Sequence, residues 1–381
     1  MNFGELSSLA DDHKTKSFVG TATLRNPSDQ YADYGLIAFL GLAQRLLVRL
    51  LPITWEATMS HVGEGGQARI EQALGNIQAN LAFKRFRHLE VNQFKEIAQE
   101  MVVLSHPMIR QHEHVVTLEG ICWDFPREGD VRPVLVFEKS PLEDFAKFAG
   151  SELFRNLSID ERLNLCADIG VAVRDMHRNG TIPYLLMELA DGTLEIIHGD
   201  LSPDNVLLFQ GTSRITAKVA DFGFATSLRG DDDLVHMPRK EPWLAPEHHD
   251  RYFSPKAAKA IDVYAFGMLC FWLLYEAGST EPLQVPASFS LNSDQFVSFL
   301  QYNSKNNLLA MWKKDGGGDK LVKLTKSLIQ QDGRLDQNQK RNLVRVMAFT
   351  LAFDSSSRCI DLERVIGFLA PERFTMPSTC S

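Results

Sequence analysis

The sequence is poor in cysteine, and its five cysteines show neither a CxxC pair nor any other metal-binding spacing. They are odd in number and stand mostly among apolar residues: Cys122, Cys166, Cys270, Cys359 and Cys380. This usage argues against a disulfide framework and against a zinc site. We therefore expect reduced, buried thiols in an intracellular protein.

A long uncharged apolar run is also missing. The first five residues have no basic region and no apolar stretch, so a secretory signal is not expected. Residues 35–51 are apolar but carry Arg45 and Arg49, and residues 263–274 are shorter than the about 20 residues that cross a bilayer. We expect no membrane span and a location in the cytoplasm, with the nucleus as the alternative.

Positive charge is in deficit. The net charge is −8, which argues against nucleic acid as a main partner. The chain has 381 residues, with 44% hydrophobic and 23% charged side chains, and we detect no internal repeat. These values are typical of a soluble globular protein that forms one two-lobed unit or two domains.

Short strand-like segments precede long helical ones along the chain. A capping box, Ser158 to Glu161, opens a helix in the second half. This order predicts an α+β fold of two lobes, with a small five-stranded antiparallel sheet and one helix over a larger, mainly helical lobe. The expected strands are residues 57–62, 67–73, 80–86, 115–118 and 134–137, and the expected helix of the small lobe is 91–104.

The predicted boundaries follow the same change of pattern. Residues 1–53 form an N-terminal extension whose amphipathic helix, 34–51, ends at Pro52. The N-lobe is 54–138, the C-lobe 139–370 and the C-terminal tail 371–381. Residues 181–195 are expected as an insertion that contains a hairpin of strands 184–189 and 193–197.

Two short motifs carry the chemistry. The first runs from His198 to Asn205 and places Asp200 five residues before the asparagine; the second is Asp221-Phe222-Gly223. A strand-like hairpin joins them, which argues against two unrelated turns. Carboxylate and amide oxygens suit Mg²⁺, and this set is typical of a phosphotransferase. The stretch resembles the catalytic loop and metal motif of the eukaryotic-type protein kinases.

This resemblance implies a role for each motif residue. Asp200 would be the catalytic base, while Asn205 and Asp221 would bind Mg²⁺, with Mn²⁺ as an alternative. Lys84, in the segment Leu81-Ala82-Phe83-Lys84, would hold the phosphates of ATP, with Glu100 as its helix partner. Lys84, Asp200 and Asn205 are thus the expected catalytic set, and ATP and a protein substrate are the expected partners.

Further positions match the family's nucleotide site. Gly63 and Gly65 match a glycine-rich turn over the phosphates, although Ala68 stands at the third glycine. Phe137 matches the gatekeeper, and the backbone from Glu138 to Ser140 matches the hinge that receives adenine. Three apolar residues would enclose the ring: Ile70, Ala82 and Leu207.

The resemblance continues beyond the chemical site and spans residues 54–370. Ala245-Pro246-Glu247 matches a motif whose glutamate pairs with a late arginine, here Arg358. Asp262 matches an aspartate that supports the catalytic loop from below. In the family these elements form the platform for a protein substrate.

The chain departs from the family at two positions of the catalytic loop. Gly199 replaces an arginine that receives an activation-segment phosphate, and Ser202 replaces a lysine beside the γ-phosphate. Lys240, where the family usually has threonine, is either the substitute cation, with Arg239 as a fallback, or a lysine that points to solvent or pairs with a carboxylate such as Glu241. Between residues 224 and 244 the only hydroxyl side chains are Thr226 and Ser227, so a mid-segment phosphate switch is not expected.

Three functions fit these motifs. The preferred one is an ATP-dependent protein kinase acting on serine or threonine hydroxyls. The alternatives are a pseudokinase scaffold that binds nucleotide weakly, and a small-molecule phosphotransferase similar to the aminoglycoside and choline kinases. The last alternative explains Gly199 and Ser202 but not Glu247, Asp262 or Arg358.

Overall fold

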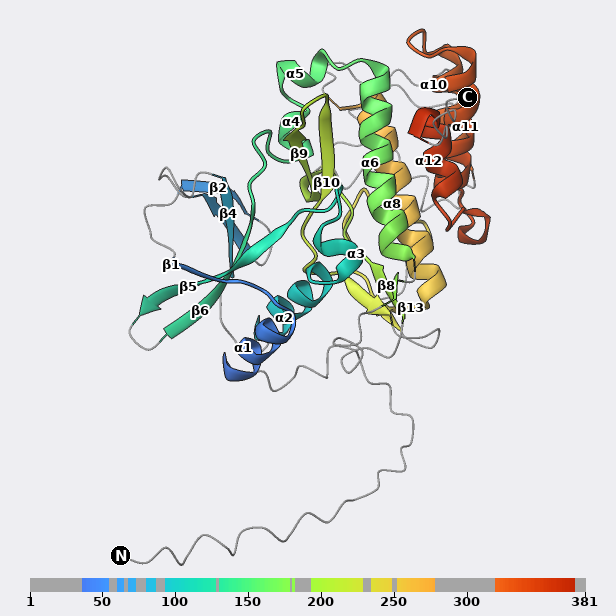
Figure 1. The fold of residues 1–381 in the computed structure, drawn as a ribbon. Helices are drawn as coiled ribbons and strands as arrows, with labels where there is room; N and C mark the ends of the chain where they lie inside the picture. The colour runs from blue at the N-terminus through green and yellow to red at the C-terminus, as the bar shows by residue number, and fades with distance from the viewer. Residues whose placement is uncertain are drawn as a thin grey trace, which may run out of the picture.

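A computed structural model describes most of the chain between residues 36 and 373. The described residues are 36–54, 60–64, 68–72, 80–86, 93–127, 130–178, 180–181, 193–228, 234–248, 252–277 and 319–373. A twisted sheet with two helices forms one lobe, and long helices form most of the other (Figure 1). The predicted two-lobed α+β fold is confirmed.

The N-lobe sheet has six strands in the order β1-β5-β6-β4-β3-β2. The expected five antiparallel strands were therefore one too few, and the additional strand β1 runs parallel to its neighbour β5. Residues 51 and 53 of β1 pack on a buried cluster around Phe83, so apolar burial accounts for the extra strand. The strands are β1 (Leu50–Thr54), β2 (Ser60–Glu64), β3 (Ala68–Gln72), β4 (Leu81–Phe86), β5 (Leu118–Arg127) and β6 (Asp130–Glu138).

The helix expected over residues 34–51 is shorter than predicted. Helix α1 (Leu36–Arg45) is followed by a turn in which Leu47 has a φ of 54°, and residues 50–53, assigned from sequence to the extension, lie in β1. Pro52 does not end a helix; it lies in an edge strand, where a missing N–H is tolerated.

Helix α1 packs against α2 (Gln93–Leu104), which is the helix expected over 91–104. The two helices lie side by side beneath the sheet in Figure 1. Phe39 of α1 is fully buried, and its ring centroid lies 5.6 Å from that of Phe94 of α2. Helix α1 therefore supports the back of α2, the helix that carries Glu100.

Strands β5 and β6 also differ from their predicted ranges, 115–118 and 134–137. Val115 forms only an isolated bridge to Val219, while β5 begins at Leu118 and continues to Arg127. Gly120 and Pro126 interrupt the apolar pattern of β5, which explains why its sequence does not read as a strand.

The C-lobe is built on two long helices, α6 (Ile159–His177) and α8 (Pro255–Tyr275). The predicted capping box of Ser158 and Glu161 begins α6. In the described part of the chain, α8 is the one helix long and apolar enough to cross a membrane, and 83% of its apolar window is buried inside the protein. Burial explains its composition as that of a core helix, and the absence of a membrane span stays a prediction.

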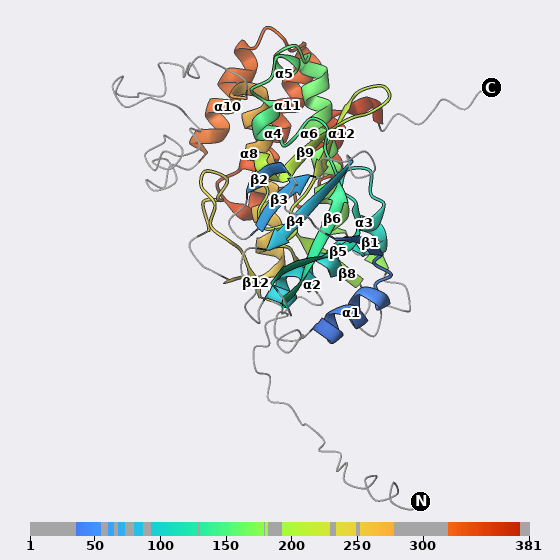
Figure 2. The ribbon, with the colours of Figure 1, turned by 90° about the vertical axis from the view of Figure 1, so that its left-hand side faces the viewer.

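Shorter elements surround this pair (Figure 2). The helices are α3 (Pro107–Arg110), α4 (Phe145–Phe148), α5 (Glu152–Arg155), α10 (Lys320–Gln331), α11 (Gln337–Leu351) and α12 (Glu363–Leu369). The strands are β7 (Gly180–Thr181), β8 (Thr193–Ile197), β9 (Val206–Gln210), β10 (Ile215–Val219), β11 (Thr226–Leu228), β12 (Val235–His236) and β13 (Tyr252–Phe253). Strand β8 occupies its predicted range, but it pairs with β7 and β11, and the other predicted strand, 184–189, lies outside the described residues.

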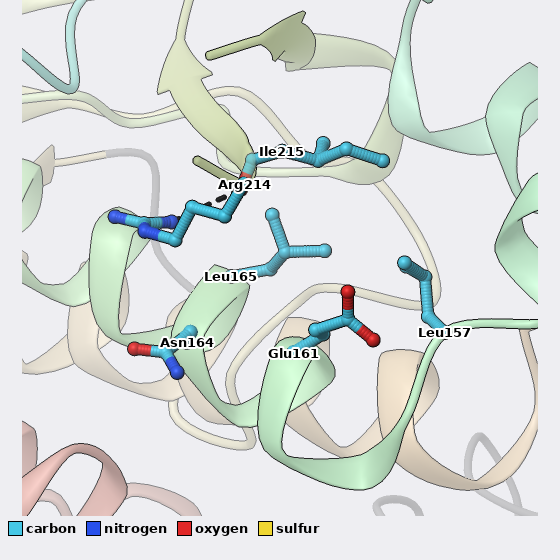
Figure 3. A pocket seen from close by; sticks show the side chains of 6 residues that line it. All are labelled: Leu157, Glu161, Asn164, Leu165, Arg214 and Ile215. Atoms are coloured by element: carbon cyan, nitrogen blue, oxygen red, sulfur yellow. Dashed lines mark hydrogen bonds between the residues drawn. The ribbon is translucent and has the colours of Figure 1, made fainter. Parts of the chain in front are cut away.

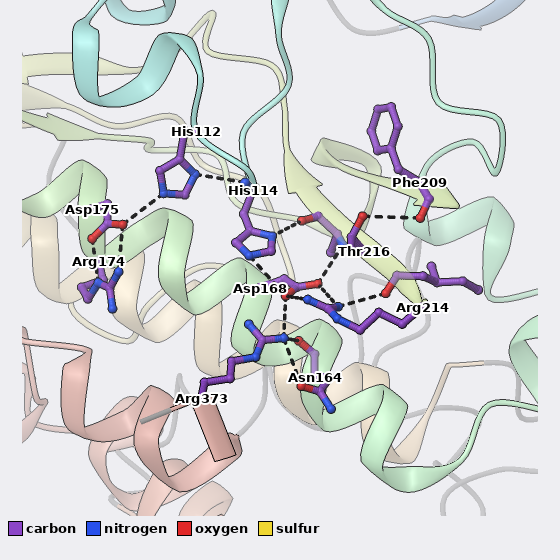
Figure 4. Close-up of polar contacts among 12 residues, drawn as sticks. His112, His114, Asn164, Asp168, Arg174, Asp175, Phe209, Arg214, Thr216 and Arg373 are labelled. Carbon is purple, nitrogen blue, oxygen red and sulfur yellow. Dashed lines mark hydrogen bonds and ion pairs between the residues drawn. The ribbon is translucent and has the colours of Figure 1, made fainter. Parts of the chain in front are cut away.

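A buried carboxylate joins distant parts of the chain (Figure 4). Asp168 of α6 accepts hydrogen bonds from Arg214 at 2.7 and 2.8 Å and from Arg373 at 2.8 Å. Its Oδ2 also accepts from the backbone N–H of Ala217 at 3.0 Å. The arginine at 373, predicted to lie in the tail, therefore fastens the chain's late residues to α6 and to the β9–β10 hairpin.

The thiols agree with the expectation for a reduced protein. Cys122, Cys166 and Cys270 are buried and free, and Cys359 is free and partly exposed. Cys380 lies outside the described residues.

Candidate active site

Strand β4 and helix α2 bring the predicted lysine and glutamate together. Lys84 Nζ donates to both carboxylate oxygens of Glu100, at 2.9 and 2.8 Å, and to Asp221 Oδ1 at 2.7 Å. Lys84 is 7% exposed and Glu100 is 1% exposed. Three elements of the fold therefore meet at one buried ammonium group.

Burial and charge pairing act in opposite directions on the pKa values of these three groups. Burial alone would lower the pKa of Lys84, but the carboxylates of Asp221 and Glu100 outweigh it and raise that pKa above its ordinary value. Burial favours a higher pKa for Asp221, yet the attraction of Lys84 prevails and lowers it. Burial raises the pKa of Glu100, with Lys84 opposing the rise. Lys84 is thus held as a cation.

The catalytic loop is anchored from the C-lobe core. Asp262 of α8 accepts the backbone N–H of His198 at 2.8 Å and that of Gly199 at 2.9 Å. Gly199 has a φ of +78°, and a Cβ built there would lie 3.3 Å from the carbonyl oxygen of Phe224. Glycine adopts this left-handed backbone without strain. The loop is therefore positioned by the residue that the sequence assigned to support it.

Asp200 and Asn205 face each other across the loop. Asn205 Nδ2 donates to the backbone oxygen of Asp200 at 2.7 Å and to its Oδ2 at 2.8 Å. Burial raises the pKa of the Asp200 carboxyl, while Lys240, His198 and Asn205 oppose that rise. Asp200 is thus a largely buried carboxylate, with its side chain 9% exposed and one oxygen already oriented.

The two predicted metal ligands fit a hard cation. Because Asn205 uses its amide nitrogen toward Asp200, its amide oxygen remains for a ligand. Asp221 uses Oδ1 for Lys84 and for the N–H of Gly223, and its side chain stays 38% exposed. One amide oxygen and one carboxylate oxygen, with space left for phosphate oxygens, form a donor set suited to Mg²⁺.

Asp221 also has a φ of 60°, in the left-handed region. Such a conformation costs energy for a non-glycine residue and persists where neighbouring contacts hold it. Phe222 is fully buried, and its ring centroid lies 5.1 Å from that of His198. The two motifs are thus packed against each other.

The predicted adenine-binding residues lie on the adjoining strands. Ala82 pairs with Phe137 between β4 and β6, and Gly63 pairs with Ile70 between β2 and β3. Leu207 is partly buried on β9, next to the catalytic loop. Gly65 and the side chain of Ile70 lie outside what the structure describes.

The side chains of the expected hinge are occupied by protein contacts. The Glu138 carboxylate accepts from Lys218 at 2.7 and 3.0 Å and from the N–H of Thr117 at 2.8 Å. Ser140 Oγ donates to the carbonyl oxygen of Glu143 or of Leu208. The backbone N–H of Glu138 also donates, to the carbonyl oxygen of Thr117 at 3.1 Å, and that of Lys139 donates to Asn80 at 2.8 Å. The Lys218 contact was missed because 80 residues separate it from Glu138.

A pocket behind α6 is separate from this site. Figure 3 shows its lining: Leu157, Glu161, Asn164, Leu165, Arg214 and Ile215. It holds about 20 Å³, room for a single water molecule. It is too small for a nucleotide.

Below the loop, the predicted pair of Glu247 and Arg358 is present. Arg358 donates to the two carboxylate oxygens of Glu247 at 2.5 and 2.8 Å and to the carbonyl oxygen of Ala260 at 3.0 Å. The sequence matches the family model for the protein kinase domain over residues 57–359. The chain belongs to the protein kinase family.

Among curated proteins, this kinase is similar to plant receptor kinases. It is 30% identical over 217 residues to a putative wall-associated receptor kinase-like 16 of Arabidopsis thaliana, covering 56% of this chain and 44% of that protein. It is 29% identical over 216 residues to wall-associated receptor kinase 5 of the same plant, covering 56% of this chain and 26% of the relative. The chain therefore spans less than half the length of these relatives.

Proposed function

We propose that this chain is an active ATP-dependent protein kinase that transfers the γ-phosphoryl group to a serine or threonine hydroxyl. The observation that carries the proposal is the contact of Lys84 with both Glu100 and Asp221. Desolvating the Lys84 ammonium group and the Glu100 carboxylate costs free energy, and such perturbed charges are typical of functional sites, here a phosphate-binding site. A scaffold that binds no nucleotide would not need that arrangement.

Each site residue then has a role. Lys84 binds the α and β phosphates, and Glu100 holds the lysine in place. Asp200 orients the substrate hydroxyl and accepts its proton; the hydrogen bond from Asn205 to Oδ2 supports this because it fixes the carboxylate plane. The backbone of residues 138–140 binds adenine, and Gly63, Gly65, Ile70, Ala82, Phe137 and Leu207 enclose the nucleotide.

Asn205 and Asp221 would hold Mg²⁺, with Mn²⁺ as an alternative. When bound, the metal neutralises phosphate charge and helps to orient the transferring group. The free oxygens of the two side chains support this assignment. In the resting site, Lys84 provides the positive charge beside Asp221.

A protein substrate is favoured over a small molecule. The buried ion pair of Glu247 and Arg358, together with Asp262 under the loop, belongs to the part of the family fold that receives protein substrates. The relatives named receptor kinases agree with this preference. The cytoplasm stays the proposed location, because it provides ATP and keeps thiols reduced.

The test is transfer of radiolabelled phosphate from ATP to a peptide array, with Mg²⁺ or Mn²⁺. Lys84→Met should abolish transfer, whereas Lys147→Met, at a 43% exposed surface lysine, should leave it unchanged. Wild-type protein that transfers no phosphate to any peptide, while still binding nucleotide, would favour the scaffold alternative. Transfer to aminoglycoside or choline instead would favour the small-molecule alternative.

A further inference from the structure

The catalytic loop lacks a cation at the position where a phosphotransferase needs one. Ser202, fully buried, occupies the place of the family's lysine. Phosphoryl transfer depends on positive groups near the phosphate oxygens, because positioning and electrostatic stabilisation provide most of the catalysis. A serine hydroxyl cannot replace that charge.

A lysine from another segment fills the neighbourhood of this serine. Lys240 Nζ donates to Ser202 Oγ at 2.8 Å and lies 3.5 Å from Asp200 Oδ2 and 3.7 Å from Asp204 Oδ2. Its side chain is 32% exposed, so it is neither free in solvent nor sealed in the core. The adjacent Arg239 side chain is exposed.

A backbone turn fixes the position of the main-chain atoms of Lys240. Lys240 follows β12, and its carbonyl oxygen accepts the N–H of Trp243 at 3.1 Å in a tight turn. Trp243 is 4% exposed and Ala245 is 2% exposed, so the turn is held on the C-lobe core. A flexible side chain rooted on a fixed turn can move its ammonium group by a small rotation without moving the backbone.

We propose that Lys240 supplies, from the segment between β12 and β13, the cation that the catalytic loop lacks at Ser202, and that it serves the γ-phosphate and Asp200. The proposal rests on the proposed kinase function and deepens it. Compared with the family pattern, the hydroxyl stands in the catalytic loop, at Ser202, and the lysine stands in the later segment, at Lys240. The contact of Lys240 with Ser202 brings the two positions together. The cation therefore comes from the segment that also leads into the substrate platform.

The surrounding charges explain why such a cation is needed. Three carboxylates lie at this end of the loop: Asp200, Asp204 and Asp221. The basic side chains that face Asp200 are those of Lys240 and His198. The Lys240 ammonium group lies within 3.7 Å of both Asp200 and Asp204, so it offsets their negative charge at the place where the γ-phosphate would add more.

Lys240→Met is the first variant, with Arg239→Met as the matched control. Lys240→Met should lower kcat about 100-fold, the usual effect of removing one stabilising donor, and this loss should be much larger than any rise in KM for ATP. Arg239→Met should behave like wild type. A Lys240→Met enzyme with normal kcat would overturn the proposal.

The second test restores the charge from the other side. Lys240→Thr combined with Ser202→Lys recreates the lysine in the loop and the hydroxyl in the segment. The double variant should recover much of the kcat that Lys240→Thr alone loses. A purely structural lysine would give no such recovery, so a double variant no better than the single one would also contradict the proposal.

A third measurement separates this inference from the proposed function. If wild-type protein transfers no phosphate, the kinase proposal fails, and binding of ATP and ADP with Mg²⁺ then decides the role of Lys240. Lys240→Met should weaken ATP more than ADP, because only ATP carries the γ-phosphate. An equal effect on both nucleotides, or none, would refute the assignment.

Discussion

Removing Asp262 is expected to weaken both the fold and the reaction. This carboxylate on α8 is 1% exposed and accepts the buried N–H groups of His198 and Gly199. Asp262→Ala leaves two donors without acceptors, and each such group costs about 1–3 kcal/mol. We therefore expect the free energy of unfolding to fall by about 2–6 kcal/mol.

The assay is urea denaturation followed by tryptophan fluorescence, with kcat measured on the same preparations. The midpoint should fall at a nearly constant slope, since the surface exposed on unfolding is unchanged. The value of kcat should fall as well, because the loop that loses its anchor carries Asp200 two residues after His198.

His177→Leu is the matched control. His177 Nε2 lies 3.1 Å from Asp262 Oδ2, and among the described residues its Nδ1 has no hydrogen-bond partner. The leucine variant keeps an acceptor for both backbone N–H groups and should lose much less stability than Asp262→Ala. Asp262→Asn, which retains one oxygen, should fall between them. Equal losses for His177→Leu and Asp262→Ala would refute the reasoning.

Three further results are expected. Phe39→Ala should lower the free energy of unfolding by about 3–5 kcal/mol and should also lower kcat/KM, because α1 supports α2. Ile37→Ala, at an 86% exposed site, should change neither quantity. Equal melting temperatures for the two variants would contradict this expectation. Protein expressed in bacteria and treated with phosphatase should keep its activity. The only hydroxyl side chains between residues 224 and 244 are Thr226 and Ser227, and both lie in the paired strand β11. A loss of activity that phosphorylation of these residues restores would contradict this expectation. Burial raises the pKa of Asp200 above the ordinary value for an aspartate, about 4, so kcat/KM should begin to fall at a pH above 4 on acidification. A pH–rate profile whose acidic limb lies at about 4 would argue against Asp200 as the base.

The fold class and the contacts expected around Lys84 agree with the sequence, whereas the bounds of several helices and strands do not. Lys84, Glu100 and Asp221 meet as expected, because each lies in a motif whose local backbone is set by neighbouring residues. The pair of Glu247 and Arg358 was also expected, although 111 residues separate them, because the family resemblance supplied the contact. Periodicity alone would not have found it.

What failed depends on tertiary contacts. Residues 50 and 51 were predicted as the end of a helix because of Pro52, and the neighbouring strand β5 makes residues 50–54 a sheet edge instead. Two contacts link segments that are far apart in the sequence: Asp168 with Arg373, and Glu138 with Lys218. No local sequence pattern predicts them. The contact of Lys240 with Ser202 likewise links two segments, and the role of this lysine stays a proposal.

The most direct test of the kinase assignment compares two aspartate variants in one phosphotransfer assay. Asp200→Asn should lower kcat about 10²- to 10⁴-fold, the usual contribution of a positioned base, with ATP affinity nearly unchanged. Asp221→Asn should instead weaken the binding of ATP with Mg²⁺, because it removes a carboxylate suited to the metal. If both variants transfer phosphate as fast as wild type, at unchanged ATP affinity, this site does not carry out the reaction.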